Sequence, residues 1–383
     1  MNGPGMRRIV KIVHESSCNR VVETGKQMTI TIESAGSRDE KDWTAYVARH
    51  PGAHLAHCWA WKDIFENVFG HSSHFLIARQ NVSPEPQVIV GVLPLFHVRS
   101  FLFGSALIAV PYLNGGGVLA DDGEVRRMLV EAAGSLGLKL GVKYVEFRER
   151  ERLLLGVSSL FERSHKVVML LPLMNDSQKM LMSFPSKFRN KIRRPEKSGF
   201  HVEEFSGGSE DLSAVETFYT VFSRHMRDLG TPVYPKSLFV SVARAFGERC
   251  RILLAWHEGK PTSCGLTIGY KDKVEIPWAS SLMKYNQFRP NTLLYWHAIK
   301  RACEDGYAVF DFGRSSPDSG TFEFKRQWGC EPAPLYWYYA GGEANVPDVN
   351  PNNPKFSALV QCWMRLPVPL ANAIGPWITR SLP

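Results

Sequence analysis

One pattern occurs twice in this chain, and it restricts the folds that the chain can adopt. Gly141 to Arg148 reads Gly-Val-Lys-Tyr-Val-Glu-Phe-Arg, and Gly306 to Arg314 reads Gly-Tyr-Ala-Val-Phe-Asp-Phe-Gly-Arg. Each copy begins with a glycine, continues as an apolar strand with one acidic residue, and ends at an arginine. Each copy also follows an amphipathic helix pattern, over 124–138 and over 292–303.

A hairpin pattern precedes each copy as well, over 74–95 and over 251–270. The same order of elements therefore repeats at an offset of roughly 165 to 180 residues, which favours a duplicated α/β unit over a chance similarity between two buried strands. The chain has 383 residues, more than one hydrophobic core normally serves. Its hydrophobic fraction of 44% is enough for two packed domains, so a disordered protein is excluded.

The positive charge of the chain is concentrated in three places. The formal net charge is +9, and residues 187–200 alone hold six Lys or Arg against one Glu. Residues 1–26 and 354–383 also carry an excess of basic residues. A uniformly basic surface would indicate nonspecific binding of nucleic acid, whereas separate basic segments indicate local anion contacts or solvated faces.

The cysteines and the apolar segments favour a cytoplasmic protein. Seven cysteines are scattered without paired spacing, which is typical of reduced thiols. The N-terminus has only short apolar runs, so a secretory signal is not expected, and the start at Met1 or Met28 stays open. The charge-free run from Leu366 to Thr379 is too short to span a membrane and contains three prolines.

The segment around the second copy of the repeat predicts a candidate site. A buried strand over Val309–Phe312 is expected to end in a polar loop over Gly313–Gly320. From Thr321 the alternation of apolar and charged residues predicts a second strand. This arrangement would bring four polar side chains together at the end of a sheet: Asp311, Arg314, Ser315 and Lys325. The alternative is a solvated surface hairpin.

A second candidate is the basic segment at 187–200. Its cations could hold a pyrophosphate, a nucleotide or an RNA backbone, or they could form a solvated face. Pro195 makes a continuous helix over this segment doubtful. The basic residues concerned are Lys187, Arg189, Lys191, Arg193 and Arg194.

Several dispersed motifs resemble one family of acyltransferases. They include Leu229-Gly230-Thr231-Pro232, Phe310-Asp311-Phe312-Gly313-Arg314-Ser315, Phe324-Lys325 with Trp328-Gly329, and Asn350-Pro351-Asn352-Asn353-Pro354-Lys355. From about Met28 onwards, the chain resembles the FemAB-related proteins, a branch of the GNAT-like acyltransferases. It is most similar to the branch associated with exosortase and PEP-CTERM sorting systems.

The resemblance implies a duplicated GNAT-like fold of the α/β class, with two lobes of mixed, mostly antiparallel sheets flanked by helices. On that basis residues 1–27 are an N-terminal extension, 28–175 the first lobe, 176–345 the second lobe, and 346–383 a Pro-rich tail that packs on the lobes. Fem-like enzymes transfer an amino acid from aminoacyl-tRNA to an amine of a peptidoglycan precursor. The exosortase-linked branch is associated with exopolysaccharide production.

The resemblance also implies roles for individual residues. A Lys beside the reacting groups corresponds to Lys325, and a basic helix-start motif near acceptor phosphates corresponds to Arg189, Ile192, Arg193 and Gly199. We expect Lys325 or Arg314 to stabilise an oxyanion or bind phosphate, and Asp311 to accept a proton or orient Arg314. The remaining expected substrate contacts are Lys187, Arg194, Ser315, Phe324, Tyr112, Asn114, Trp278 and Tyr295.

Direct transfer is expected, since the chain has no Gly-x-Ser-x-Gly elbow and no cysteine with an obvious partner. No cofactor or metal is expected, with aminoacyl-tRNA or acyl-coenzyme A as the donor and an amine on a nucleotide-linked or sugar molecule as the acceptor. The alternatives are a coenzyme-A-dependent enzyme acting on an amino sugar, and a noncatalytic adaptor that binds tRNA or a sorting-system protein. Five histidines within 50–74 read as structural, and a membrane contact of the C-terminal segment stays open.

Overall fold

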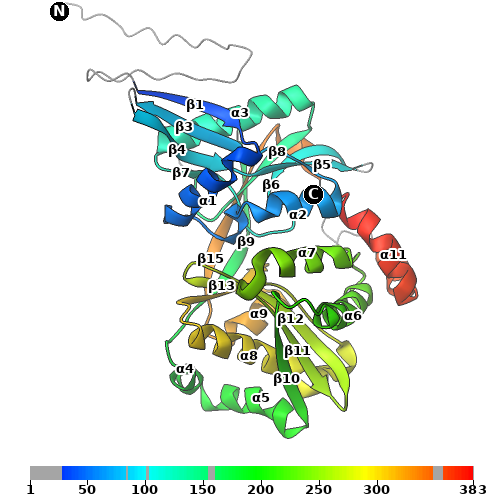
Figure 1. Cartoon of the computed structure of the whole chain (residues 1–383). Coiled ribbons are helices and arrows are strands. Elements are labelled where there is room, and N and C mark those ends of the chain that lie inside the picture. Colours follow the sequence, from blue (N-terminus) through cyan, green and yellow to red (C-terminus); the bar gives the residue numbers. More distant parts are fainter. Residues whose placement is uncertain (1–27, 83–84, 101–102, 154–159, 348–356, 383) are drawn as a thin grey trace, which may run out of the picture.

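The protein folds into two lobes joined by a continuous β-sheet (Figure 1). The structure is a computed structural model, and it describes residues 28–82, 85–100, 103–153, 160–347 and 357–382. The extension at 1–27 and the Asn-Pro motif at 350–355 lie outside the described residues. The mixed α/β class expected from the sequence is confirmed, with mostly antiparallel sheets covered by helices.

The first lobe contains two helices of ten residues, one helix of 18 residues, and several strands. Its elements are β1 (Met28–Ser34), α1 (Glu40–Arg49), α2 (Ala60–Phe69), β2 (Ser72–Ser73), β3 (Leu76–Val82), β4 (Glu85–Leu93), β5 (Leu95–Ser100), β6 (Gly104–Ala109), β7 (Leu119–Ala120), α3 (Gly123–Leu140) and β8 (Tyr144–Glu149). Strands β1, β3, β4 and β7 form a separate four-stranded sheet.

The rest of the chain forms the second lobe and two C-terminal helices. Its elements are β9 (Leu160–Pro172), α4 (Ser177–Ser183), α5 (Ser186–Lys197), β10 (Phe200–Ser206), α6 (Ser213–Asp228), α7 (Lys236–Phe246), β11 (Cys250–His257), β12 (Lys260–Tyr270), β13 (Lys273–Ser281), α8 (Pro290–Glu304), β14 (Val309–Ser315), α9 (Gly320–Arg326), β15 (Glu331–Ala340), α10 (Ser357–Met364) and α11 (Val368–Thr379).

The repeated sequence pattern corresponds to a repeated piece of structure. In the first lobe, β6 and β8 are parallel and α3 connects them; in the second lobe, β13 and β14 are parallel and α8 connects them. Gly141 and Gly306, the first residues of the two copies, follow these helices with φ angles of 63° and 79°. Glycine adopts this left-handed conformation at little cost, so it can end a helix and start the return to the sheet.

The two lobes exchange strands at the centre of the large sheet. The order β13-β14-β9-β15-β8-β6 places β9, which follows β8 in the chain, beside β14. It also places β15, which follows β14, beside β8. Val167 and Val168 of β9 thus pair with Ser315 and Arg314 of β14. The boundary at 175/176 stays a prediction, and each lobe is completed by a strand from the other copy.

A shared hydrophobic core supports this exchange. Helices α1 and α2 of the first lobe and α6 and α7 of the second lobe contribute to one cluster of buried side chains. For example, the ring centroids of Trp61 in α2 and Phe246 in α7 lie 5.1 Å apart. Each lobe also has its own core, and because the shared cluster covers the junction, the lobes are held in a defined relation.

Three local expectations differ from the structure. Residues 320–326 form helix α9 rather than a strand, because the Ser319 hydroxyl accepts a hydrogen bond from the Phe322 N–H and caps the helix. Strand β14 continues to Ser315, since Gly313 at φ 72° forms an irregularity after which pairing with β9 resumes. Helix α5 is continuous through Pro195, which lies in its last turns with a buried ring.

Among the described residues, no helix is both long enough and apolar enough to cross a bilayer. Helices α10 and α11 instead lie along the side of the two lobes (Figure 1).

Two adjacent glycines test the contact between β15 and the first lobe. A Cβ atom on Gly341 would lie 2.6 Å from the Lys143 carbonyl oxygen, whereas one on Gly342 would meet no atom within 4 Å. Both residues have positive φ angles, of 113° and 87°. We expect Gly341→Ala to lower the free energy of unfolding by about 2 to 4 kcal/mol and Gly342→Ala by about 1 kcal/mol in urea titrations. Equal losses would contradict the close approach of β15 to β8.

Candidate functional site

The candidate site lies where the pairing of β14 with β13 ends and the pairing of β14 with β9 continues. Residues 309–311 of β14 pair with residues 273–275 of β13 on one edge and with β9 on the other; after an irregularity, β14 pairs with β9 again at Arg314 and Ser315. Gly313 lies in this irregularity, and a Cβ atom there would be 3.3 Å from the Asn114 side-chain nitrogen. The strand end predicted from the sequence therefore lies at the junction of the two lobes.

Lys325 is held against this strand by helix α9. Its ammonium group donates to the carbonyl oxygens of Gly313, at 3.0 Å, and of Arg314, at 2.9 Å. The side chain is buried, and this burial lowers the pKa of Lys325 to about 8, with the nearby Asp311 carboxylate acting in the opposite direction. A cation with a pKa near neutrality, fixed to the backbone of a buried strand, is suited to stabilise negative charge that develops close by.

Aromatic side chains fix the position of Lys325. The rings of Tyr295 in α8 and Phe312 in β14 stack at 5.3 Å, and Phe324 packs edge-on against Tyr295 at 5.2 Å. Trp328 is fully buried beneath them. The substrate contacts of Tyr295 and Phe324 stay predictions; in the structure the buried Tyr295 packs against the half-buried Phe324 of α9.

Two buried carboxyl groups lie on one side of the strand. Asp311 accepts hydrogen bonds from the Arg150 Nη1, at 2.8 Å, and from the Gly313 N–H, at 2.8 Å. Glu275 lies 3.8 Å from the Arg150 Nη2 and accepts a 3.5 Å hydrogen bond from Asn114. Burial, together with the Asp311 charge, raises the pKa of Glu275. Asp311 thus binds Arg150 and the Gly313 backbone. Among the described residues its side chain forms no hydrogen bond or ion pair with Arg314.

Asp311, Glu275 and Arg150 line a pocket between the lobes, which we call the junction pocket. Its walls come from the first lobe at 53–55 and Arg150, and from the second lobe at 268–275 and Asp311. His54 contributes a buried ring nitrogen, Nδ1, without a hydrogen-bond partner among the described residues. The junction pocket therefore has polar groups available to a bound molecule.

The other side of the strand carries three cations, Arg148, Arg314 and Lys166. The guanidinium groups of Arg148 and Arg314 lie 4.8 and 5.4 Å from the centre of the Trp337 ring. Arg148 donates to Glu146 at 2.6 Å, but within the described residues neither Arg314 nor Lys166 has a carboxylate within ion-pair distance. The surrounding protein and the charge of Arg148 lower the pKa of Arg314, although solvent still reaches its side chain. These two unpaired cations are suited to bind an anion.

Four further predicted residues are placed as follows. Asn114 reaches Glu275, as described above, and Tyr112 lies on the first-lobe side with its hydroxyl 2.8 Å from the His71 Nε2. Ser315 is buried, and its hydroxyl has no hydrogen-bond partner among the described residues. Trp278 is buried edge-on against Phe239 of α7, at 5.4 Å, which favours a packing role over substrate contact.

The basic residues of α5 do not join the group around Lys325. Helix α5 lies at the far end of the second lobe (Figure 1). The Arg189 Nη1 donates to the Phe184 carbonyl at 2.5 Å and thereby caps α4, and the Lys191 ammonium donates to Gln327 at 2.9 Å. Three of the predicted contacts are exposed on the helix surface: Lys187, Arg193 and Arg194.

Sequence reasoning missed five residues of the site. Glu275 and Arg150 form the acidic side, and Arg148, Lys166 and Trp337 belong to the cationic side. Only Arg148 carried a signal, because it is the counterpart of Arg314 in the repeated pattern. The others lie on strands whose neighbours depend on the exchange between the lobes.

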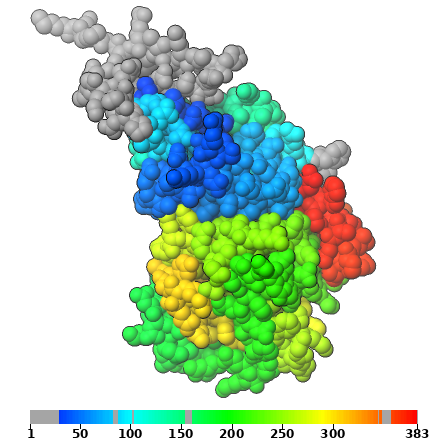
Figure 2. Space-filling view, viewed as in Figure 1, coloured from blue at the N-terminus to red at the C-terminus, as the bar shows by residue number. Residues whose placement is uncertain are grey.

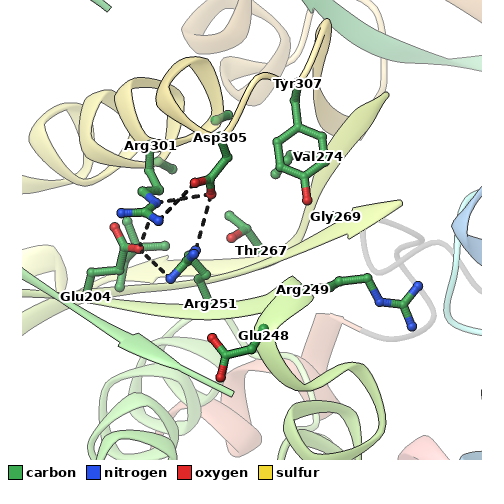
Figure 3. A pocket seen from close by; sticks show the side chains of 13 residues that line it. Glu204, Glu248, Arg249, Arg251, Thr267, Gly269, Val274, Arg301, Asp305 and Tyr307 are labelled. Carbon is green, nitrogen blue, oxygen red and sulfur yellow. Dashed lines mark hydrogen bonds and ion pairs between the residues drawn. The ribbon is translucent and has the colours of Figure 1, made fainter. Parts of the chain in front are cut away.

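A second pocket of the second lobe contains a closed network of charges (Figure 3). Arg251 lies 3.2 Å from Glu204 and 3.4 Å from Asp305, and Arg301 lies 2.9 Å from Asp305 and 3.6 Å from Glu204. Two cations and two anions compensate one another here. The network links α8 to β10 and β11, so we assign it a structural role.

The histidines of the first lobe take part in packing. His57 is buried, its Nε2 lies 3.2 Å from the Gly117 carbonyl oxygen, and burial lowers its pKa to about 4. In the described part of the chain, no group of three His, Cys, Asp or Glu side chains is arranged to hold a metal ion.

With this geometry in view, comparisons with known proteins are informative. Residues 186–326 match the family model described as the acetyltransferase (GNAT) domain. Much of the second lobe is therefore similar to a GNAT domain. The match ends one residue after Lys325, so it includes β13, α8, β14 and α9.

A curated relative and a solved structure are also similar to this chain. The UDP-N-acetylmuramoylpentapeptide-lysine N(6)-alanyltransferase of Weissella viridescens is 27% identical over 154 residues, which are 39% of this chain and 44% of that protein. The chain thus matches less than half the length of this relative. FemX has the same fold, with a TM-score of 0.61 at 15% identity over 80% of this chain and 96% of FemX.

A third similarity concerns fold alone. The C-terminal domain of a putative lysylphosphatidylglycerol synthetase from Agrobacterium fabrum has a TM-score of 0.54 at 13% identity, over 81% of this chain and 93% of that domain. Together the comparisons show that the chain shares its fold with FemX and is similar to a GNAT domain over residues 186–326.

The two carboxyl groups of the junction pocket should respond differently to neutralisation. Because the folded-state pKa of Glu275 is raised, its stabilising contribution is complete below its unfolded pKa of about 4.3 and is lost as the pH rises through the folded value. We expect Glu275→Gln to increase the free energy of unfolding by about 1 to 2 kcal/mol at pH 8, with the gain vanishing near pH 4. Urea titrations across this range measure it.

Asp311→Asn is the matched control for this experiment. It removes the carboxylate that Arg150 and the Gly313 N–H bind, so we expect a loss of about 2 to 4 kcal/mol at pH 8. A loss of stability in both variants at pH 8 would contradict the assignment of Glu275 as the carboxyl group with the raised pKa.

Proposed function

We propose that this protein is an N-acyltransferase that forms an amide by moving an aminoacyl group from aminoacyl-tRNA to an amine of a nucleotide-linked envelope precursor. The observation that carries the proposal is Lys325, a buried cation that a GNAT domain holds against the strand at the lobe junction. The Weissella relative, an alanyltransferase named for a UDP-linked muropeptide, supports the choice of an aminoacyl group and of this kind of acceptor.

The proposed reaction is direct attack of the acceptor amine on the carbonyl carbon of the donor ester. A C–N bond forms, the ester C–O bond then breaks, and the released hydroxyl of the donor takes up a proton. Lys325 stabilises the negative oxygen of the tetrahedral intermediate. Its pKa of about 8 keeps the ammonium form populated at neutral pH.

A proton must leave the attacking amine, and we assign its acceptance to Glu275. Burial and the neighbouring Asp311 carboxylate raise the pKa of Glu275, which makes its carboxylate more basic than an exposed one. Asp311 is already occupied by Arg150 and by the Gly313 N–H. We therefore propose that Asp311 positions the loop before Arg314.

The unpaired cations Arg314 and Lys166 are proposed to bind phosphate groups of a substrate. Both the tRNA backbone and a nucleotide diphosphate supply such groups. The Trp337 ring beneath Arg314 restrains the guanidinium, so less conformational entropy is lost when the anion binds.

The proposed biological process and location rest on the sequence motifs that resemble the exosortase-linked branch. We propose that the enzyme acts in cell-envelope or exopolysaccharide biosynthesis, on the cytoplasmic side of the membrane, in a system with an exosortase. A coenzyme-A-dependent reaction and an adaptor role without catalysis remain the alternatives, and the donor panel below separates them.

Lys325 and its neighbour Arg326 form a matched pair for the test. Arg326 lies on the same helix but is exposed and paired with Glu323. We expect Lys325→Met to lower kcat about 100- to 1000-fold and Arg326→Met to leave it unchanged within about twofold. The measurement is transfer of labelled alanine from alanyl-tRNA to a UDP-linked muropeptide, with acyl-coenzyme A as a second donor.

Three results of this assay would contradict the proposal. Transfer from acyl-coenzyme A but not from charged tRNA would support the coenzyme-A-dependent alternative. Binding of tRNA without transfer from any donor would support the adaptor. Equal loss of activity in both variants would remove the special role of Lys325.

The pH dependence tests the charge state of Lys325. Because the ammonium form is lost as the pH rises through about 8, we expect kcat to fall above that pH. Lys325→Arg keeps its positive charge above pH 8, so its residual activity should not show this descending limb. An identical limb in both proteins would assign it to another group.

A further inference from the structure

The C-terminal helices present an apolar face that no other described part of the chain covers. Leu370, Ile374 and Trp377 follow one another at helical spacing along α11, and their side chains are 44%, 38% and 70% exposed. Leu359 in α10 is 68% exposed. Isolated exposed apolar residues are common, but an exposed apolar row on one helix indicates an interaction surface.

The opposite face of α11 shows that the helix is firmly attached to the protein. Ala371, Gly375 and Thr379 form a row of small residues that packs against the second lobe. A Cβ atom on Gly375 would lie 2.9 Å from both the nitrogen and the oxygen of Val233. The helix therefore places its small residues inward and its large apolar residues outward, the reverse of an ordinary surface helix.

The charges around this face suit an anionic surface. Residues 357–382 include Arg365 and Arg380 and contain no Asp or Glu. Both arginines are exposed, and the Arg380 guanidinium lies 5.6 Å from the centre of the Trp377 ring. Tryptophan next to arginine is typical of side chains at the boundary between lipid headgroups and acyl chains.

The shape of the face also bears on its partner. In Figure 2 the C-terminal segment, coloured red, projects as a ridge from the side of the molecule, beside the boundary between the lobes. A projecting ridge has no groove to receive the side chains of a folded partner, whereas a fluid lipid surface adapts to it.

We propose that the outer face of α11, together with Leu359 and the two arginines, docks the protein on the surface of a membrane that contains anionic lipids. Apolar side chains enter the interface, and Arg365 and Arg380 contact lipid phosphates. Tyr112 donates a 3.3 Å hydrogen bond to the Thr379 carbonyl, so the docked helix would bring the first-lobe side of the site near the bilayer. This inference is independent of the proposed reaction.

Vesicle flotation of the full chain tests the proposal. We expect the protein to float with vesicles of phosphatidylcholine containing about one third phosphatidylglycerol, and to bind pure phosphatidylcholine more weakly. Ile374→Glu with Trp377→Glu should lower the partition coefficient at least tenfold. Arg365→Ala and Arg380→Ala should each lower it about fivefold at low salt.

Leu138→Glu is the matched control, because Leu138 is an 86% exposed apolar residue on another helix, α3. It should bind vesicles as the unchanged protein does, and thermal melting should show that all variants remain folded. If the double variant is unstable, quenching by brominated lipid provides a second measurement. The fluorescence that Trp377→Phe removes should be the part that the lipid quenches.

Two outcomes would overturn the inference. The first is absence of flotation by the unchanged protein, or flotation that the glutamate substitutions do not reduce. The second is a dimer in solution that becomes a monomer in Ile374→Glu with Trp377→Glu, without binding to either kind of vesicle. That result would assign the face to a contact between two copies of the chain.

Discussion

The antiparallel pairing of β9 with β15 is the interaction on which the rest of the structure depends. The pair runs from Leu160 opposite Ala340 to Leu170 opposite Glu331, and it lies at the centre of the large sheet. Each of the two strands continues one copy of the repeated unit and completes the sheet of the other. Backbone hydrogen bonds of each lobe thus depend on the other lobe, which holds them in one arrangement.

The candidate site is a consequence of this exchange. Strand β14 pairs with β9 at both ends, whereas its pairing with β13 stops at Asp311. Beyond that point the backbone carbonyls of Gly313 and Arg314 accept hydrogen bonds from the Lys325 ammonium. The exchange of strands also brings Arg148 and Arg314, the final residues of the two repeated segments, to the same indole ring of Trp337. The two copies of the repeated sequence pattern therefore both contribute side chains to one site.

The charges at the junction are separated into two groups with different properties. Glu275, Asp311 and Arg150 form a buried group in which acids outnumber the cation, and burial, with the Asp311 charge, raises the pKa of Glu275. Arg314 and Lys166 form a group of cations in which burial, with repulsion from a neighbouring arginine, lowers both pKa values. Lys325 lies between them, influenced by Asp311 and by Arg314. Such a division is suited to transfer chemistry, in which proton removal and binding of anions occur side by side.

Much of this protein was determined by its sequence alone. The periodicity over 124–138 and 292–303 predicted helices, the glycines at 141 and 306 marked their ends, and the repeat predicted two α/β units. The alternation from Thr321 to Lys325 was too short to separate a strand from a helix, and the Ser319 cap decided in favour of α9. These features are local, because they depend on residues a few positions apart.

Only the tertiary structure decided which strands are neighbours. The pairing of Glu275 with Asp311, the contact of Arg150 with Asp311 and the position of Trp337 beneath Arg314 each join residues from different strands. No local pattern specifies such contacts, since strand order follows from the burial of the whole sheet and from the exchange of β9 and β15. The sequence therefore determined the elements and several of the reactive side chains, whereas long-range packing determined the site that they form.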